Sequence, residues 1–266
     1  METAFELGAL GVGAVTLLDA ARAGRRWLAF ALAALAYALT FELLVSNEAS
    51  GGFHYGAFLI ALPGGAPLWV PVGWMALITA AARTAERLSV SRWRPALAAL
   101  LVALTGWVLD PVAVALGWWG WSAPGQPLVL GAPAGNYLAW IFVALAFTGL
   151  VDAGWRWRAS AWVPVVAAPL ALGLVAALSM VSQLPVDPRW TLAAISLVVI
   201  AAAARTFPWT GPSARPAVVL PPAFVTLGCA ALVTMHGLAS WPLLLAGAAS
   251  VAAHALNPGS RSSASR

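Results

Sequence analysis

A succession of long apolar runs, separated by segments that carry arginine, constrains this chain more than any other feature. Of its 266 residues 62% are hydrophobic and only 9% are charged, whereas soluble domains carry about 25% charged residues. A helix that crosses a bilayer needs roughly 17–25 largely apolar residues, and runs of about that length recur along the whole chain. The sequence therefore predicts an all-α, polytopic bundle of transmembrane helices.

Applied run by run, this length rule predicts about nine spans. They lie near residues 4–20, 27–45, 67–82, 95–116, 135–151, 161–181, 190–206, 217–236 and 239–256. The third and the last run are short, and merging or demoting the last pair would give eight spans. We expect residues 1–256 to form a single integral membrane domain. The Ser- and Arg-rich tail at 257–266 is typical of a disordered, basic segment.

The distribution of arginine predicts how the bundle is oriented. The chain has no lysine, and thirteen of its fourteen arginines fall in one alternating set of loops and the C-terminal tail, whereas the other set holds only Arg189. Cytoplasmic loops are enriched in basic residues, so we expect the N-terminus outside and the C-terminus inside the cell membrane. Because the basic residues flank apolar runs, we interpret the net charge of +5 as a topology signal and expect no nucleic-acid partner.

One carboxylate, Asp110, lies within an apolar run where an ionisable group is expensive. Placing such a group at mid-bilayer costs about 2.5–3.5 kcal/mol on insertion scales, so intramembrane acids usually have a function. The functional interpretation is a proton donor, because an apolar environment favours the neutral form of a carboxyl group. The structural alternative is a carboxylate bonded to a neighbouring helix or to Asn136. Pro111 follows directly and disturbs the helix at this point.

Three more polar residues fall toward the same membrane face as Asp110. Glu42 lies near the outer end of the second span, His54 lies in the loop that follows it, and Asn136 begins the fifth span. Glu42 is either a partner of Asp110 or a solvated residue at the interface. His54 is either a proton relay or an interfacial hydrogen-bonding residue.

Tryptophans crowd the sequence around Asp110. Those at the membrane interfaces are expected in any membrane protein, and Trp118, Trp119 and Trp121 fit that interpretation as well. A second interpretation is that they line a site around Asp110. It is favoured because Trp74, Trp107 and Trp140 would approach the same end of the bundle. A dry indole face stabilises a cation by up to about 2 kcal/mol. The chain lacks a His/Glu cluster with metal-ligand spacing and has a single cysteine, Cys229, so we expect neither a metal nor another cofactor.

Two segments carry a recognisable pattern: Leu109 to Trp121, which holds Asp-Pro and Gly-Trp-Trp-Gly-Trp, and Gly131 to Trp140. They resemble a known family, the bacterial and archaeal membrane proteins of carotenoid biosynthesis, which include carotenoid 1,2-hydratases and bisanhydrobacterioruberin hydratases. The resemblance implies a bacterial or archaeal cell membrane. Glu42 and the Pro-Val-Gly-Trp stretch at 71–74 lie where the family has similar elements, so the resemblance covers about 37–150. The chain departs from the family at Gly51–Gly56, where a Gly-rich Phe-Gly-x-Tyr-x-Tyr segment is usual.

The resemblance implies a lyase-type hydratase that adds water to a terminal isoprenoid double bond of a carotenoid without a cofactor. Asp110 would be the acid, Glu42 its partner or the base for water, and Asn136 would hold the water or orient Asp110. The predicted substrate-binding residues are Trp74, Trp107, Trp118, Trp119, Trp121, Trp140, Tyr137, His54 and Tyr55. The same residues would serve a proton-initiated terpenoid cyclase, and a non-enzymatic lipid-binding or carrier protein is a further alternative. The oligomeric state stays open.

Overall fold

The chain is mostly helical in the computed structural model, which describes residues 2–47, 53–87, 93–122, 128–157, 160–179, 216–236 and 241–255. Eight helices lie in this described part of the chain. They are α1 (Glu2–Ala23), α2 (Arg25–Asn47), α3 (Trp69–Arg87), α4 (Arg94–Ala115), α5 (Ala134–Trp157), α6 (Val163–Ser179), α8 (Pro216–His236) and α9 (Trp241–Ala255).

Each of these helices coincides with one predicted span. Five of them, α1, α2, α4, α5 and α8, are long and apolar enough to cross a membrane by length and composition. The helices α6 and α9 are shorter, with 17 and 15 residues. The predicted span at 190–206 and the tail at 257–266 lie outside the described residues. The structure therefore confirms a bundle of apolar helices, while the full number of spans stays a prediction.

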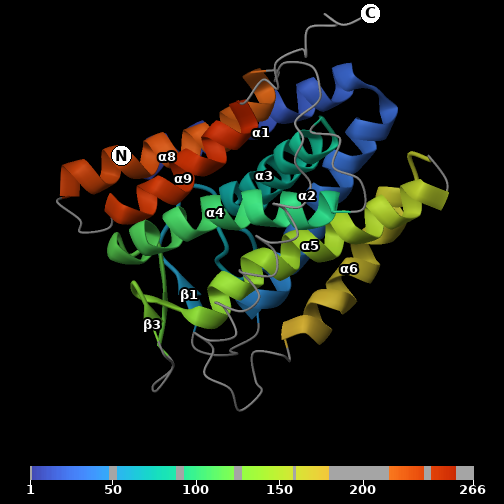
Figure 1. Cartoon of the computed structure of the whole chain (residues 1–266). Helices are drawn as coiled ribbons and strands as arrows, with labels where there is room; N and C mark the ends of the chain where they lie inside the picture. The colour runs from blue at the N-terminus through green and yellow to red at the C-terminus, as the bar shows by residue number, and fades with distance from the viewer. Residues whose placement is uncertain are drawn as a thin grey trace, which may run out of the picture.

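The helices α3 and α4 lie in the middle of the bundle (Figure 1). Around them pack α1 and α2, then α5 with α6 on one side and α8 with α9 on the other. The middle position explains why α4 is the most enclosed of the long helices, with buried residues on all its faces. A helix that is apolar all round is typical of the interior of a bundle, and α4 is the helix that carries Asp110.

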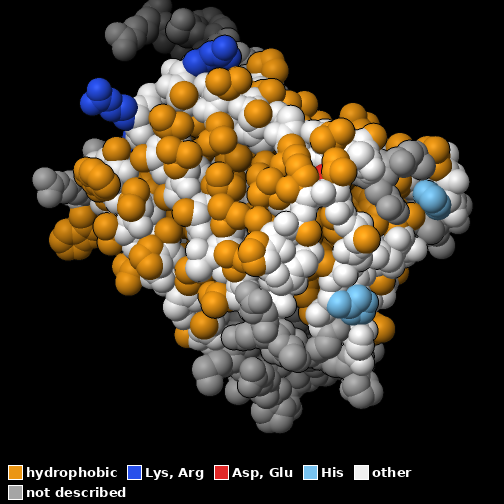
Figure 2. Space-filling view, turned by 180° about the vertical axis from the view of Figure 1, so that it is seen from behind, with side chains coloured by type: hydrophobic (Ala, Val, Ile, Leu, Met, Phe, Trp, Pro, Cys, Tyr) orange, Lys and Arg blue, Asp and Glu red, His pale blue; other side chains and the backbone are white. Residues whose placement is uncertain are grey.

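Many large apolar side chains are exposed on the outer surface of the described helices. Figure 2 shows one face covered by hydrophobic side chains, with arginine visible only near one end. Exposed large side chains include Leu18 on α1, Leu170 on α6 and Leu227 on α8, at 57%, 58% and 69% exposure. A soluble monomer rarely exposes contiguous apolar patches beyond a few hundred Å², so this surface fits contact with lipid.

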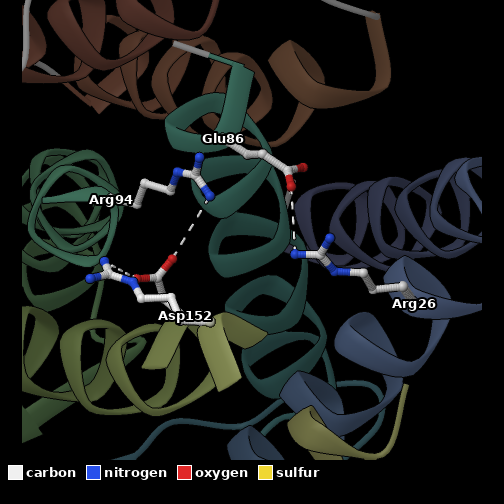
Figure 3. A network of polar contacts seen from close by, with 5 residues as sticks. Arg26, Glu86, Arg94 and Asp152 are labelled. Atoms are coloured by element: carbon white, nitrogen blue, oxygen red, sulfur yellow. Dashed lines mark hydrogen bonds and ion pairs between the residues drawn. The ribbon is translucent and has the colours of Figure 1, made fainter. Parts of the chain in front are cut away.

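One end of the bundle is held by ion pairs, and we call it the arginine end. Arg26 of α2 pairs with Glu86 of α3 at 3.6 Å, and Asp152 of α5 lies 4.0 Å from Arg94 of α4 (Figure 3). Asp152 also pairs with Arg156 one turn further along α5.

A second contact at the arginine end lies deeper in the bundle, where Asp19 of α1 pairs with Arg83 of α3. Its side chains are only 12% and 13% exposed. Aromatic rings support the same arginines, because the Arg26 guanidinium lies 3.7 Å from the ring centre of Trp155 and that of Arg83 lies 5.6 Å from Trp27. The acids of the apolar runs near this end are thus partners of the basic residues that flank those runs.

Two chain segments form a small sheet at the opposite end, which we call the sheet end. Strand β1 (Phe53–Tyr55) pairs antiparallel with β2 (Trp119–Trp121), so that Tyr55 lies across from Trp119. Nearby, β3 (Leu128–Val129) pairs with β4 (Ala132–Pro133). The two loops that hold β1 and β2 therefore pair with each other, and the Gly56 N–H continues this pairing by donating to the Trp118 carbonyl. We call β1 and β2 together the lid.

Candidate active site

A cavity with a volume of about 280 Å³ lies beneath the lid. Helices α1, α2, α3, α4, α5 and α8 all contribute to its walls. Most of its lining is apolar or aromatic, and four lining residues have polar side chains other than indole: Glu42, Tyr55, Asp110 and Asn136. The cavity therefore has the composition of a site for an apolar molecule with a few directing groups.

Asp110 is 2% exposed and receives two hydrogen bonds on one oxygen atom. The side-chain amide of Asn136 donates to Oδ2 at 2.5 Å, and the indole N–H of Trp140 donates to the same oxygen at 2.7 Å. No described residue donates to Oδ1, and Asp110 lines the cavity. The carboxyl group thus has one fixed oxygen and one oxygen available to a molecule in the cavity.

Glu42 is 3% exposed and is bonded in a different way. The Tyr55 hydroxyl donates to Oε2 at 2.5 Å, and the indole N–H of Trp74 donates to Oε1 at 3.0 Å. Both oxygens of Glu42 thus accept a hydrogen bond, whereas within the described chain only Oδ2 of Asp110 does. The two acids of the cavity therefore differ in their hydrogen bonding, although both are buried.

Two indoles connect the acids. The rings of Trp74 and Trp140 lie with centroids 4.1 Å apart and planes tilted by 31°. Trp140 is held from behind by Gly106 of α4, because a Cβ atom at that position would lie only 2.0 Å from the indole ring. The absence of a side chain at Gly106 is what allows the ring to pack directly on the α4 backbone. Each ring of the pair points its N–H edge at one of the two carboxyl groups.

The lid closes the cavity at the sheet end. Because side chains alternate along a strand, Phe53 and Tyr55 face the cavity and the exposed His54 faces away. Across the ladder Trp119 and Trp121 line the cavity as well. Burial, and after it the neighbouring carboxyl group of Glu42, raises the pKa of Tyr55 well above its usual value. Its phenol therefore stays protonated and able to donate.

A buried acid near the start of α1 fixes the chain that follows the lid. Glu6 is 2% exposed, and its two oxygens accept the backbone N–H groups of Ile60 and Leu59, each at 2.9 Å. The segment between β1 and α3 is thereby tied to α1. Backbone groups of an irregular segment at membrane depth need such partners.

The structure brings all three predicted catalytic residues, Asp110, Glu42 and Asn136, into one cavity. Of the predicted substrate-binding residues, five line it: Trp74, Trp119, Trp121, Trp140 and Tyr55.

Four other predicted substrate-binding residues lie elsewhere. Trp107 donates to the backbone oxygen of Tyr137 at 3.4 Å, and the Tyr137 hydroxyl donates to that of Val129 at 2.8 Å. Trp118 is buried against Phe5 and Trp69, behind the wall of the cavity. His54 contacts Ser122 at 3.4 Å on the exposed side of the lid.

Several lining residues had no signal in the sequence. They come from α1 and α8, whose apolar runs look uniform, and include Phe5, Ala9, Phe224 and Val225. Their contribution depends on helix packing, because the rings of Phe5 and Phe224 contact each other with centroids 5.0 Å apart and planes tilted by 41°. Among the described residues, no three His, Cys, Asp or Glu side chains lie close enough to hold a metal ion.

A model of the family described as carotenoid biosynthesis protein matches residues 5–203. This match spans well over half of the chain. The chain belongs to the carotenoid biosynthesis protein family. No curated protein and no solved structure matches it.

The family match begins earlier and ends later than the resemblance at 37–150. It includes Glu42, Tyr55, Asp110 and Asn136, and nearly the whole cavity wall. The lining residues of α8, which are Pro221, Phe224 and Val225, lie beyond its end. Membership of this family gives the chain a role in carotenoid biosynthesis, and its apolar helices fit a membrane protein with a lipophilic substrate.

Proposed function

We propose that this chain hydrates a terminal isoprenoid double bond of an acyclic carotenoid end. The observation that carries this proposal is the unequal hydrogen bonding of two buried acids in one apolar cavity. Asp110 leaves Oδ1 available, whereas Glu42 accepts on both oxygens. Two titratable groups kept in different environments are how one site supplies both an acid and a base.

The first step is protonation of the alkene. Asp110 donates the proton on Oδ1 to the less substituted carbon, and the electron pair of the double bond forms the new C–H bond. Asn136 and Trp140 donate hydrogen bonds to Oδ2 and thereby stabilise the negative charge that develops on the carboxyl group. The product is a tertiary carbocation. Indole faces stabilise a cation by about 2 kcal/mol where water is excluded, and the indoles of Trp74 and Trp121, which line the cavity, would supply such faces.

The second step is capture by water. A lone pair of the water oxygen forms the C–O bond, and the proton that water loses passes to Glu42. The cycle closes when the proton on Glu42 returns to Asp110 through exchangeable groups or solvent. The balance is one alkene and one water in, and one tertiary alcohol out, with no oxidant or reductant.

The cavity volume limits what binds inside. At the usual packing density of protein interiors of about 0.74, a cavity of 280 Å³ holds on the order of ten carbon atoms, or two isoprenoid units. We therefore place only the end group of the carotenoid in the cavity, with the remaining polyene among the helices or in lipid. One end would react at a time.

The orientation of the bundle is part of the proposal. The arginine end would face the cytoplasm, since basic residues are retained there, and the cavity would lie in the outer half of the membrane. A C-terminal reporter that is active only in the cytoplasm should then be active, and an inactive reporter would contradict this orientation.

Pigment analysis of a lycopene-producing host tests the activity. Expression of the wild-type chain should give carotenoids heavier by the mass of one water, and Asp110→Asn should abolish them at equal protein levels in the membrane. An isomer of unchanged mass would instead indicate a cyclase. Unchanged pigments with wild-type protein, or hydrated pigments with Asp110→Asn, would contradict the proposal.

A further inference from the structure

The lid contributes one hydroxyl group to the cavity. Among the lid side chains that line it, Phe53, Trp119 and Trp121 have no hydroxyl group. The hydroxyl of Tyr55 donates a hydrogen bond to Glu42. The ring of Tyr55 is fixed by an edge contact with Phe53, with centroids 4.8 Å apart, and by a second with Trp119 at 6.1 Å. The adjacent backbone is fixed too, because the Gly56 N–H donates to the Trp118 carbonyl at 2.8 Å.

The Tyr55 hydroxyl and Glu42 together form a group of acceptors. The phenol donates its hydrogen to Oε2 of Glu42, so the lone pairs of its own oxygen remain free to accept. Each carboxylate oxygen also keeps a lone pair beyond the hydrogen bond that it already accepts. A water molecule that donates to this pair would direct its own lone pair toward the cavity, because both residues line it.

We propose that Tyr55 is a positioning residue which, together with Glu42, holds the water that captures the carbocation. This inference rests on the proposed hydration and extends it to the fate of the cation. A tertiary cation beside a carboxylate has two outcomes, and Tyr55 determines which one prevails.

Both outcomes balance without any further reactant. In capture, the water oxygen forms the C–O bond and Glu42 takes the proton. In the second outcome, the return of the cation to the alkene, a C–H bond beside the cation breaks and its electron pair re-forms the double bond. The proton goes to the Asp110 carboxylate. In D₂O the acid carries deuterium, so return with loss of hydrogen leaves deuterium on the recovered carotenoid.

The test is Tyr55→Phe in the full-length chain, with lycopene supplied in membranes equilibrated in D₂O. Phenylalanine keeps the ring that contacts Phe53 and Trp119 and removes only the hydroxyl. We expect the hydrated product to fall at least tenfold while deuterium still enters the recovered lycopene. Tyr37→Phe is the matched control: Tyr37 is buried, its hydroxyl donates to the Val143 carbonyl at 3.0 Å, and it does not line the cavity. It should hydrate lycopene at the wild-type rate.

Two results would overturn the role of Tyr55. One is hydration by Tyr55→Phe at the wild-type rate, and the other is loss of both hydration and deuterium incorporation in a folded Tyr55→Phe protein. Thermal unfolding in detergent reports folding. Should Tyr55→Phe not fold, Glu42→Gln replaces it and must also lose hydrated product while deuterium still enters lycopene. Loss of both hydration and deuterium incorporation in Glu42→Gln would count against the proposal. Failure of the proposed hydration gives different results from failure of the Tyr55 role. In that case the wild-type chain makes no hydrated product, or Asp110→Asn still incorporates deuterium.

Discussion

Trp74 and Trp140 stack with their ring centroids 4.1 Å apart, and each donates its indole N–H to a different buried acid. Trp74 donates to Glu42, and Trp140 donates to Asp110. The N–H bond of an indole that faces a carboxyl group is polarised toward that group, which leaves more electron density on the ring faces. The pair therefore orients both acids, and Trp74 and Trp140 both line the cavity in which a cation would form.

The first prediction separates the N–H group of Trp140 from its ring. Trp140→Phe keeps an aromatic face but removes the donor to Oδ2 of Asp110, which leaves only Asn136. Loss of a hydrogen bond to a charged group costs about 1.5–3 kcal/mol. We expect hydration of lycopene to slow by about tenfold to a hundredfold, measured as initial rates at equal protein in membranes.

Trp107→Phe is the control for this change. Trp107 lies on the same helix as Asp110, but its N–H points to the Tyr137 carbonyl at 3.4 Å and its ring does not line the cavity. The rate with Trp107→Phe should stay within a factor of about three of wild type, because a weak bond outside the site is lost. Equal losses in the two variants would argue against a role for the Trp140 N–H.

A second prediction concerns the contact between Gly106 and Trp140. A Cβ atom at position 106 would lie 2.0–2.3 Å from atoms of the indole, so Gly106→Ala must push the ring away from α4. Overpacking of a filled interior typically costs about 1–3 kcal/mol. We expect a lower unfolding temperature in detergent and a loss of hydration activity, because the displaced ring leaves both Asp110 and Trp74.

Gly149→Ala provides the comparison, since it makes the same change within a helix. The nearest atom to a Cβ at this position is Cβ of Pro95, at 3.9 Å, which is ordinary contact. Alanine is favoured over glycine in helices by about 1 kcal/mol. The unfolding temperature of Gly149→Ala should equal or exceed that of wild type, and a loss as large as that of Gly106→Ala would remove the steric explanation.

The cavity acids and their tryptophans could be predicted from the sequence because each is an exception to its surroundings. Asp110 and Glu42 are carboxyl groups in apolar runs, and such groups need partners. The lid was foreseeable only in part. The sequence predicts that Tyr55 and Trp119 take part in the site, but the register that places them opposite each other depends on contacts between distant segments. Strand alternation then turns His54 outward, which periodicity over three residues could not reveal.

The contributions of α1 and α8 could not be predicted for a different physical reason. In a run of Ala, Leu, Val and Gly, every face of a helix is apolar, so the sequence does not show which face meets protein and which meets lipid. Phe5 and Phe224 line the cavity because Gly8 and Gly228 allow close approach: a Cβ there would lie 2.6 Å from the ring of Phe224 and 2.8 Å from that of Phe5. Nothing in the sequence indicates that Glu6 fixes the loop at Leu59, because its partners are backbone N–H groups more than fifty residues away.

A third prediction tests whether the cavity holds the substrate. Gly73 lines the cavity, and a Cβ atom built on it meets nothing within 4 Å. Gly73→Phe should therefore fill the space with a side chain instead of displacing the wall. A phenyl group occupies a large part of 280 Å³, so we expect hydration of lycopene to fall at least tenfold while the unfolding temperature stays close to wild type.

Gly11→Phe adds the same bulk on the exposed side of α1, where a Cβ also meets nothing within 4 Å. Because Gly11 does not line the cavity, this variant should retain wild-type activity. Full activity of Gly73→Phe would show that the reacting end group binds elsewhere.

The last prediction compares two glutamates at opposite ends of the bundle. Glu6→Gln replaces a carboxylate that accepts from the N–H groups of Leu59 and Ile60, so one of those N–H groups would face an amide NH₂ instead of an oxygen. A buried donor left without an acceptor costs about 1–3 kcal/mol. Glu86→Gln weakens only a surface pair with Arg26, whose two side chains are 36% and 38% exposed, and such pairs contribute at most about 1 kcal/mol. We therefore expect a clear fall of the unfolding temperature for Glu6→Gln, little change for Glu86→Gln, and faster proteolysis after Leu59 in the former alone. Equal unfolding temperatures for the two variants would mean that Glu6 does not fix the loop to α1.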